Sequence, residues 1–376
     1  MDFQYYLPVN LIFGCGKIDL LGNETKKYGT RALVVTGQGS TKKTGLLDRA
    51  LSCLQDAGIE TCVFDKVTPN PIDETVYEGV EAARNFGAEV VVALGGGSII
   101  DCAKAIAFAR YNEGDIFEYI YGMKSGTEAL PLVAVPTTCG TGSEGNCFAV
   151  LTNTETNDKK SLRNIVSVPK ASIIDPTLMT TMPDSVAASV MFDALCHNME
   201  AYLSKTTQPM VEMQALYGMK LLAGNMVKAL KDHSDLEAWS AVTLASTLGG
   251  MCINMAGVAA PHGMEHPASG LKNIVHGRGL AALSPVIYRE SVVYAPDKFS
   301  EISKILGGSC AADFVDRLNS LLEDIHLKTT LSKEGIEEKD IDWMVDNCLK
   351  VSMPAMNAHP RKFSREEIRD LYYKAL

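Results

Sequence analysis

The residues best suited to metal chemistry in this sequence are an aspartate and several histidines in two distant segments. Asp193 and His197 are four residues apart, so on a helix they would lie on one face, one turn apart. Three of the seven histidines, His262, His266 and His276, fall in one segment rich in glycine, proline and alanine. One carboxylate and three imidazoles would suit Fe(II) or Zn(II) and leave a position for a substrate oxygen. The candidate ligands are Asp193, His197, His262 and His276.

Each of these patterns alone has an ordinary structural explanation. An isolated Asp-x-x-x-His pair is most often surface or capping chemistry, and a lone histidine is most often a core or surface residue. The spacing also leaves open whether the two segments meet in the fold. Three histidines within the fifteen residues 262–276 nevertheless favour a metal site.

Two loops rich in small residues follow predicted strands in the first half of the chain. The strand predicted over 89–94 ends in GGGS at 95–98 and leads into a helix predicted over 102–110. Glycines let the backbone approach a phosphate, and a helix N-terminus offers free N–H groups. The loop is neither the G-x-G-x-x-G fingerprint nor a Walker A sequence, and many such loops are only tight turns. With a second loop at 137–144, after the strand 132–135, it predicts a phosphate-bearing ligand at the sheet edge.

The loop GQGSTKKTG at 37–45 bears on the choice of cofactor. It contains no acidic residue that could bind the 2′-hydroxyl of NAD and repel a 2′-phosphate. Gly37, Ser40, Lys42 and Lys43 would instead accommodate or attract that phosphate. The loop therefore favours NADP(H), with NAD possible, although two lysines in a loop can also be merely solvated.

The order of predicted elements divides the chain near residue 180. Before it, short apolar runs alternate with helical spacing, which is typical of a parallel sheet with helices on both faces. After Pro183 only helical patterns remain, and Ser364 followed by Glu366 and Glu367 favours the start of the last helix. We expect an α/β dinucleotide-binding domain over 1–180 and an all-helical metal-binding domain over 181–376. The strands are predicted over 31–36, 62–64, 89–94 and 132–135, and the helices over 46–57, 75–85, 102–110, 185–203, 208–231, 236–255, 297–306, 311–323, 333–349 and 364–375.

The composition is that of an ordinary globular protein of 376 residues, with 46% hydrophobic and 21% charged residues. A net charge of −10 argues against nucleic acid and anionic membrane surfaces as partners. The ten cysteines contain no C-x-x-C pair, which favours free thiols in a reducing compartment. The N-terminus lacks a signal-peptide pattern, and no apolar run approaches the ~20 residues that span a bilayer. We therefore expect a cytoplasmic protein.

Several motifs together resemble the iron-containing, or group III, alcohol dehydrogenases. The form H-x-M-E-H and the loop GQGSTKK are most similar to the butanol dehydrogenase-like, NADP-preferring branch. The motifs follow the same order through nearly the whole chain. They are FGCG (13–16), GGGSIIDCAK (95–104), VPTTCGTGSE (135–144), IIDPTLMTTMP (173–183), DALCHNMEAYLS (193–204), HGMEHPASGLKNIVHGRGLA (262–281) and the closing NAHPRKFSREEI.

The resemblance implies a dehydroquinate synthase-like fold that holds NAD(P) and a divalent metal ion between two domains. The metal positions of the family fall on the four candidate ligands, and His266 matches a histidine near the metal that is not a ligand. A cofactor lysine of the family falls on Lys159, although the adjoining Lys160 is an alternative. The other cofactor positions fall on Gly37, Gly39, Ser40, Asn70, Gly96, Gly97, Ser98, Asp101, Thr137, Thr138, Thr141, Ser143 and Leu178.

The resemblance implies a metal-dependent oxidoreductase that interconverts a small primary alcohol and its aldehyde, or a ketone, with NAD(P)(H). The metal, Fe²⁺ with Zn²⁺ as the alternative, would act as a Lewis acid on the substrate oxygen. His266 would relay a proton or orient His262. A lyase of the dehydroquinate synthase type and a non-catalytic nucleotide-binding module are the rival interpretations. A homodimer is the usual assembly of such enzymes.

Two departures from the family pattern limit what the resemblance implies. Cys196 stands before His197 where many relatives have threonine, which we interpret as a packing difference. The stretch 145–147 (Gly-Asn-Cys) lies where the nicotinamide pocket is expected. The identity of the alcohol or aldehyde is therefore not carried over.

Overall fold

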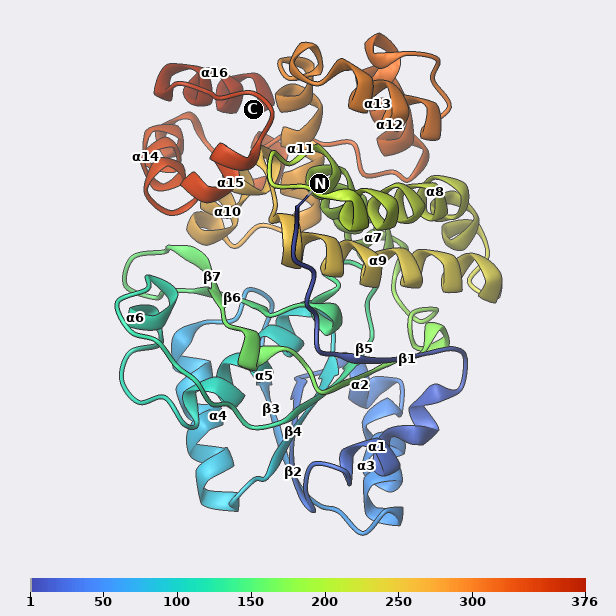
Figure 1. Cartoon of the computed structure of the whole chain (residues 1–376), viewed down its shortest axis with the longest axis vertical. Helices are drawn as coiled ribbons and strands as arrows, with labels where there is room; N and C mark the ends of the chain where they lie inside the picture. Colours follow the sequence, from blue (N-terminus) through green and yellow to red (C-terminus); the bar gives the residue numbers. More distant parts are fainter. Residues whose placement is uncertain (1) are drawn as a thin grey trace.

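Six parallel strands form the sheet of the N-terminal half. The structure, a computed structural model, describes residues 2–376. The strand order is β1-β8-β5-β4-β2-β3, and every neighbouring pair is parallel. In Figure 1 this half lies below a half made of helices. The strands are β1 (Asn10–Phe13), β2 (Arg31–Gly37), β3 (Glu60–Val67), β4 (Val90–Gly95), β5 (Leu132–Pro136) and β8 (Ala171–Ile174).

Helices cover both faces of this sheet, which explains why its central strands are apolar throughout. Every residue of β4 is buried, and alternate side chains point to opposite faces. Val91 and Ala93 pack against α4 and α5, whereas Val90 and Val92 pack against α3. The predicted α/β architecture is therefore confirmed. Its helices are α1 (Leu21–Thr25), α2 (Ser40–Lys43), α3 (Leu46–Asp56), α4 (Asp73–Phe86), α5 (Gly97–Ala109) and α6 (Ile116–Ile120).

The two small-residue loops lie side by side at the carboxyl edge of the sheet, as predicted. β4 and β5 are neighbours, with Gly95 opposite Pro136. A Cβ atom on Gly97 would lie 2.3 Å from Cγ2 of Thr141, so only glycine permits this approach. Gly95 has a φ of +158°, which glycine tolerates better than other residues. α5 begins directly at Gly97, earlier than the expected residue 102, so its free N–H groups face the cleft.

An antiparallel hairpin, β6 (Phe148–Thr152) and β7 (Lys159–Arg163), was not expected from the sequence. Its polar connection, residues 153–158, hides the strand pattern. The hairpin contacts the helical half: the buried Asp158 accepts a hydrogen bond from Asn347 (2.7 Å) and pairs with Lys350 (2.9 Å). The hairpin thus connects the two halves of the chain beside the cleft.

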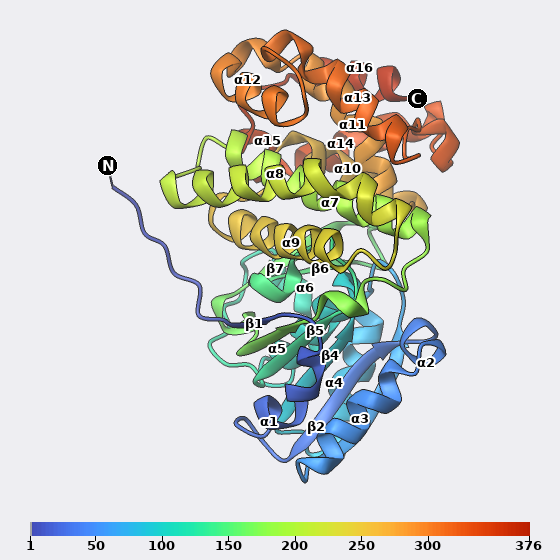
Figure 2. The same cartoon turned by 90° about the vertical axis from the view of Figure 1, so that its right-hand side faces the viewer.

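The C-terminal half contains only helices in the part of the chain that the structure describes. β8 ends at Ile174 and α7 begins at Asp184, although a domain division at residue 180 stays a prediction. Figures 1 and 2 show α7, α8 and α9 stacked above the sheet half, with the remaining helices beyond them. The helices are α7 (Asp184–Leu203), α8 (Pro209–Lys231), α9 (Leu236–Ala256), α10 (Ala260–Lys272), α11 (His276–Arg289), α12 (Pro296–Ile305), α13 (Phe314–Asp324), α14 (Ile341–Val351), α15 (Met353–Ala358) and α16 (Arg365–Ala375).

α10 and α11 form from the segment whose glycines and prolines suggest a loop. Both helices contain an internal proline, Pro267 and Pro285. The glycines serve close packing: a Cβ on Gly277 would lie 2.2 Å from the backbone oxygen of Ser189 on α7. This contact brings the start of α11 against α7. The histidines of this segment are therefore held on helices rather than on a loop.

Other predicted boundaries were partly wrong. α14 begins at Ile341 rather than at 333, because Gly335, with a φ of +93°, separates two short 3₁₀ turns before it. Ser364 caps α16 as expected, and its hydroxyl accepts a hydrogen bond from the N–H of Glu367. α9 is long and apolar enough to cross a membrane by length and composition, contrary to expectation. It packs between α7 and α8 and the sheet half, and 61% of its apolar window is buried, which is typical of a core helix.

Candidate active site

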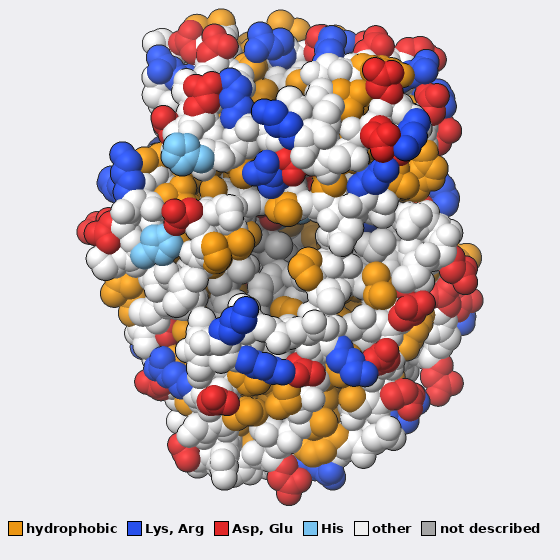
Figure 3. Space-filling model, turned by 180° about the vertical axis from the view of Figure 1, so that it is seen from behind, with side chains coloured by type: hydrophobic (Ala, Val, Ile, Leu, Met, Phe, Trp, Pro, Cys, Tyr) orange, Lys and Arg blue, Asp and Glu red, His pale blue; other side chains and the backbone are white. Residues whose placement is uncertain are grey.

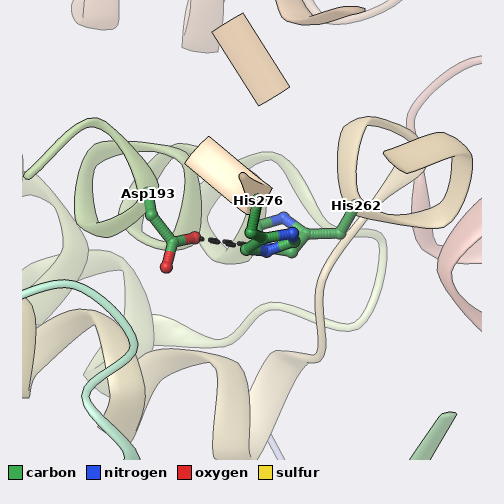
Figure 4. A group of neighbouring side chains, drawn as sticks. All are labelled: Asp193, His262 and His276. Carbon is green, nitrogen blue, oxygen red and sulfur yellow. Dashed lines mark hydrogen bonds and ion pairs between the residues drawn. The ribbon is translucent and has the colours of Figure 1, made fainter. Parts of the chain in front are cut away.

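Four side chains from three helices converge on one point of the cleft. α7 carries Asp193 and His197, α10 carries His262, and His276 is the first residue of α11. The Nε2 atoms of His262, His197 and His276 lie 3.3, 3.5 and 3.6 Å from Oδ1 of Asp193. Figure 4 shows the rings of His262 and His276 beside the carboxylate of Asp193. The two distant segments of the sequence are therefore neighbours in the fold.

The spacing of Asp193, His262 and His276 suits a shared metal ion, because their ligand atoms all lie within 4.8 Å of one another. His197 adjoins this group through Asp193 and is the fourth candidate ligand. Ligand atoms about 2.1 Å from one tetrahedral metal ion lie roughly 3.4 Å from each other. The separations of 3.3, 3.5 and 3.6 Å from Oδ1 of Asp193 are close to this value. One carboxylate oxygen and three imidazole nitrogens are also donor types that Fe(II) and Zn(II) accept. The residues present therefore fit the metal that the sequence implies.

Each imidazole ring is fixed through its other nitrogen. Because Nδ1 of each ring is engaged, Nε2 is left facing the common point, which is the usual arrangement of metal-binding histidines. The three Nδ1 contacts join His262 to Oε1 of Glu200 (2.6 Å), His276 to Oε2 of Glu265, and His197 to the backbone oxygen of Gly140 (3.3 Å).

Glu200 and Glu265 hold two of the candidate ligands and were not predicted from the sequence. Both are completely buried, and a buried carboxylate needs a partner. Glu200 follows Asp193 by seven residues, so it lies on the same face of α7, and this helical spacing could have identified it. Glu265 could be recognised only once α10 was known to be a helix that packs against the start of α11.

Burial and charge set the protonation of this cluster. Burial alone would raise the pKa of Asp193, but the neighbouring His197 and His276 outweigh it and lower that pKa below the ordinary value. Burial lowers the pKa of His197 to about 4, so its ring is neutral near pH 7. Burial opposes a positive charge on His262, yet Glu200 and Asp193 raise its pKa to about 10. The two carboxylates therefore favour a positive charge at this point of the cleft.

The predicted cofactor residues all line one cleft between the two halves of the chain, which Figure 3 shows as a hollow in the middle of the molecule. The cleft has three adjoining parts: a metal cavity beside Asp193 and the histidines, a middle cavity at the loop after β2, and an outer cavity beside Leu178. The metal cavity and the middle cavity share Ser98, Thr141 and His276, and the middle and outer cavities share Ser40 and Thr138. The metal cavity is lined by Asn70, Ser98, Asp101, Thr141, Ser143 and Lys159, the middle cavity also by Gly37, Gly39, Ser40, Gly96, Gly97 and Thr138, and the outer cavity by Thr137 and Leu178.

Asp101 and Ser143 are held by hydrogen bonds within the protein. Oδ1 of Asp101 accepts from the hydroxyl of Ser143 (2.5 Å), and Oδ2 accepts from the N–H of Val150 (3.0 Å). The buried Lys104 donates to Ser143 (2.8 Å) and to Asn146 (2.9 Å). This network joins α5, the loop after β5 and the start of the hairpin. It gives Asp101 and Ser143 a clear role in shaping the cavity wall.

The structure places Lys159, and not Lys160, in the cleft. Lys159 lines the metal cavity and donates to Oδ1 of Asn70 (2.9 Å). Lys160 instead donates to the backbone oxygen of Val351 (2.9 Å), at the end of α14. Asn70 has a φ of +50° and donates to Asn273 across the cleft (2.6 Å). Asn70 and Lys159 therefore lie where the two halves of the chain approach each other.

The loop after β2 carries less free positive charge than its sequence suggests. Lys42 forms an ion pair with Asp65, which lies on the neighbouring strand β3. The side chain of Lys43 is exposed and has no ion-pair partner among residues 2–376. Only a three-dimensional structure could bring Asp65 to this loop, because it is distant in sequence.

His266 lines the metal cavity and meets His262 only through a T-shaped ring contact, so both of its expected roles stay predictions. Its ring centre lies 6.0 Å from that of His262, and the Nδ1 atom of His262 is already engaged by Glu200. Burial and then the nearby Lys159 lower the pKa of His266 well below its ordinary value, so the ring is neutral near pH 7. A neutral imidazole offers one donor and one acceptor to the cavity.

Comparisons with known proteins place nearly the whole chain in one family. Residues 8–176 match the family profile "Iron-containing alcohol dehydrogenase", and residues 187–376 match "Fe-containing alcohol dehydrogenase family, C-terminal". The 1,3-propanediol dehydrogenase of Klebsiella pneumoniae is 35% identical over 99% of this chain and 98% of its own length. The NADPH-dependent butanol dehydrogenase of Clostridium saccharobutylicum is 28% identical over 98% of this chain and 97% of its own.

A solved structure extends the similarity to the fold. The NADH-dependent butanol dehydrogenase A of Thermotoga maritima superimposes with a TM-score of 0.92 at 30% identity, covering 100% of this chain and 98% of that one. Structures of this kind share the dehydroquinate synthase-like fold, which confirms the predicted fold class. The chain belongs to the iron-containing alcohol dehydrogenase family.

Proposed function

We propose that this member of the family works chiefly as an NADPH-dependent reductase of a small aldehyde, with Fe²⁺ in the four-residue site. Interconversion of an alcohol and its aldehyde with a nicotinamide cofactor is the activity of the family to which the chain belongs. The observation that carries the proposal is the continuity of the metal cavity with the rest of the cleft, through Ser98, Thr141 and His276.

The residues of the chain bind, orient and protect the reacting groups. When bound, the metal ion polarises a carbonyl oxygen and the nicotinamide supplies a hydride. Glu200 and Glu265 keep two of the imidazole ligands oriented. Phe148 and Ile253 form apolar walls of the metal cavity that limit the access of water. His266, which also lines this cavity, exchanges the proton that the substrate oxygen gains or loses.

The preference for NADPH rests on the loop after β2. Residues 37–45 contain no acid, and the exposed Lys43 is available to a 2′-phosphate. The pairing of Lys42 with Asp65 weakens this argument without reversing it, since one lysine remains. Relatives of both cofactor classes exist, so NAD(H) is the alternative. For the metal, Fe²⁺ is favoured by the family, with Zn²⁺ as the alternative for the same donor set.

We also propose a cytoplasmic homodimer. All ten cysteines are free, as expected in a reducing compartment. The N-terminal end of the chain runs out from the body of the protein in Figure 2, and its Phe3 and Tyr6 are 44% and 59% exposed. Strand β1 lies at the edge of the sheet, where a second copy could cover it. Light scattering of the purified protein would distinguish a dimer from a monomer.

The lyase interpretation is not favoured by the comparisons, which match alcohol dehydrogenases over both halves of the chain. The decisive test is an anaerobic assay of the Fe(II)-loaded protein with butanal, using NADPH and NADH in parallel. Consumption of NADPH well above that of NADH is expected. A preference for NADH would keep the reaction and reject the cofactor proposal. No change in absorbance with a panel of short aldehydes would reject the reductase.

A further inference from the structure

Arg163, at the end of β7, is a positive charge in the metal cavity that the proposed reaction does not use. It lines the same cavity as Asp193 and the metal-binding histidines, and it keeps accessible surface. Its guanidinium carbon lies 4.6 Å from the ring centre of Phe148, its partner across the hairpin. The stacking on Phe148 holds the planar guanidinium at the cavity wall.

No acidic group among the described residues 2–376 neutralises Arg163. Its side chain makes no hydrogen bond or ion pair with any of residues 2–376. Two acidic residues line the metal cavity, but both are engaged elsewhere: Asp101 by Ser143 and Val150, and Asp193 by the histidines. An arginine in such a position presents two parallel N–H donors to whatever occupies the cavity.

The anion that Arg163 could meet is not a phosphate of the cofactor. The glycine-rich loops suited to phosphates line the middle and outer cavities, and Arg163 lines neither of them. Lys159, the lysine that also lines the metal cavity, is already bonded to Asn70. The nicotinamide ring itself carries no anionic group. Among the molecules that the proposed reaction brings into this cavity, the substrate is therefore the one that could carry an anionic group to Arg163.

We propose that Arg163 binds a carboxylate at the far end of the substrate, so that the preferred substrate is a short, unbranched aldehyde acid. A single planar guanidinium suits a carboxylate, whereas a phosphate would call for further donors. The apolar side chains of Phe148, Val150, Ile253 and Val258 line the space for the intervening methylene groups. In the reaction the aldehyde carbon gains a hydride from NADPH and its oxygen gains a proton, while the carboxylate is unchanged.

This inference rests on the proposed reductase, so its test includes a comparison of charged and neutral substrates. Wild type and Arg163→Met are assayed with 4-oxobutanoate against butanal and with 5-oxopentanoate against pentanal. Loss of a charge-assisted hydrogen bond of this kind weakens binding about 10- to 100-fold. We expect kcat/KM for the better aldehyde acid to exceed that of its neutral partner, and to fall about 10- to 100-fold in Arg163→Met. Butanal should be affected less than about 3-fold.

Two further variants make the kinetic result specific. Arg163→Lys keeps the charge but loses the planar fork, and it should restore part of the activity on the acid. Arg317→Met removes an exposed arginine of α13, outside all three cavities, and should leave every substrate unchanged. Equal losses on acid and neutral aldehydes in Arg163→Met, a wild-type preference for butanal and pentanal, or a raised KM for NADPH alone would overturn the proposal.

A binding measurement separates this inference from the reductase proposal. Butyrate and inorganic phosphate are titrated into the metal-loaded wild type and into Arg163→Met by calorimetry, without any turnover. Butyrate should bind the wild type and lose about 10-fold or more in affinity in Arg163→Met, even if no aldehyde is reduced. Retention of butyrate binding by Arg163→Met, or tighter Arg163-dependent binding of phosphate than of butyrate, would contradict a carboxylate site.

Discussion

Nδ1 of His262 lies 2.6 Å from Oε1 of Glu200, and both side chains are buried. The other carboxylate oxygen of Glu200 accepts a hydrogen bond from the N–H of Ala259 (2.5 Å), just before α10 begins. Glu200 therefore fixes both the ring of His262 and the start of the helix that carries it. α7 thus supplies two candidate metal ligands, Asp193 and His197, and also the residue that orients a third.

The substitution Glu200→Gln tests this relationship. Glutamine keeps the shape of the side chain but lacks the negative charge that favours a cation beside His262. We expect the affinity for Fe(II) or Zn(II) to fall about 10- to 100-fold, as for other partners of metal-binding histidines. Competition with a chromogenic chelator measures this affinity. Glu237→Gln, on the exposed start of α9, is the matched control, and unchanged affinity in Glu200→Gln would reject the role.

His266→Gln separates proton exchange from metal binding. The ring lines the metal cavity and is not among the four converging ligands, so metal content should stay at the wild-type level. Loss of a general acid or base typically lowers the rate roughly 100-fold or more, so kcat for butanal should fall by that order. Metal analysis and steady-state kinetics of the same preparation give both quantities. Wild-type kcat, or loss of the metal together with activity, would show that His266 does not relay the proton.

Gly39→Asp should reverse the cofactor preference. A Cβ atom at Gly39 would meet no atom within 4 Å, so the aspartate fits without displacing its neighbours. Its carboxylate would repel the 2′-phosphate of NADPH and bind the 2′-hydroxyl of NADH. We expect KM for NADPH to rise at least about 10-fold, because such like charges cost several kcal/mol when juxtaposed. Gly39→Asn, which has the same size without the charge, is the control. An equal effect of both substitutions on NADPH would contradict the charge argument.

The buried Lys104 predicts a dependence of stability on pH. Burial, partly offset by Asp101, lowers the pKa of Lys104 to about 8, whereas an unfolded lysine has a pKa of about 10.4. Between these pH values the unfolded chain binds more protons than the folded chain. The contribution of Lys104 to the free energy of unfolding therefore rises with pH. Below pH 8 both states hold the proton, and the contribution is constant.

The pH dependence is measured as a difference between wild type and Lys104→Met. Urea unfolding of both proteins at several pH values between 7 and 10 gives their difference in unfolding free energy. This difference should move in favour of the wild type by a few kcal/mol across the upper part of the range. A difference that stays the same at every pH would show that Lys104 keeps an ordinary pKa in the folded protein.

Much of the fold could be predicted from the sequence because its central strands are buried on both faces and are therefore apolar throughout. The apolar run at 89–94 has few alternatives to a parallel strand, and it became β4. The hairpin β6–β7 was missed because β7 (KKSLR) and the connection 153–158 are mostly polar, although Ala149, Leu151 and Leu162 of the hairpin pack into the core of the sheet half. α10 and α11 were missed because their glycines suggest a loop, whereas Gly277 serves a close contact with α7.

The candidate site was predicted less completely than the fold, for physical reasons. Asp193 and His197 share a helix face, so their spacing alone suggests a pair. Their meeting with His262 depends on the packing of α7 against α10 and α11, which spacing does not encode. The pairing of Lys42 with Asp65 and the exposure of Arg163 to the metal cavity likewise depend on contacts between strands. The contacts of charged residues with partners distant in sequence could therefore not be predicted.

The most direct test of the central claim is a measurement of metal content and NADPH-linked butanal reduction in the same samples. These are the wild type as purified, after removal of the metal by a chelator, and after reloading with Fe(II), together with Asp193→Ala. The wild type should lose activity with the metal and recover it on reloading. Asp193→Ala should hold less than about a tenth of the metal and show no turnover after reloading, since a ligand is lost. Full activity in the metal-free wild type or in Asp193→Ala would contradict metal-dependent reduction at this site.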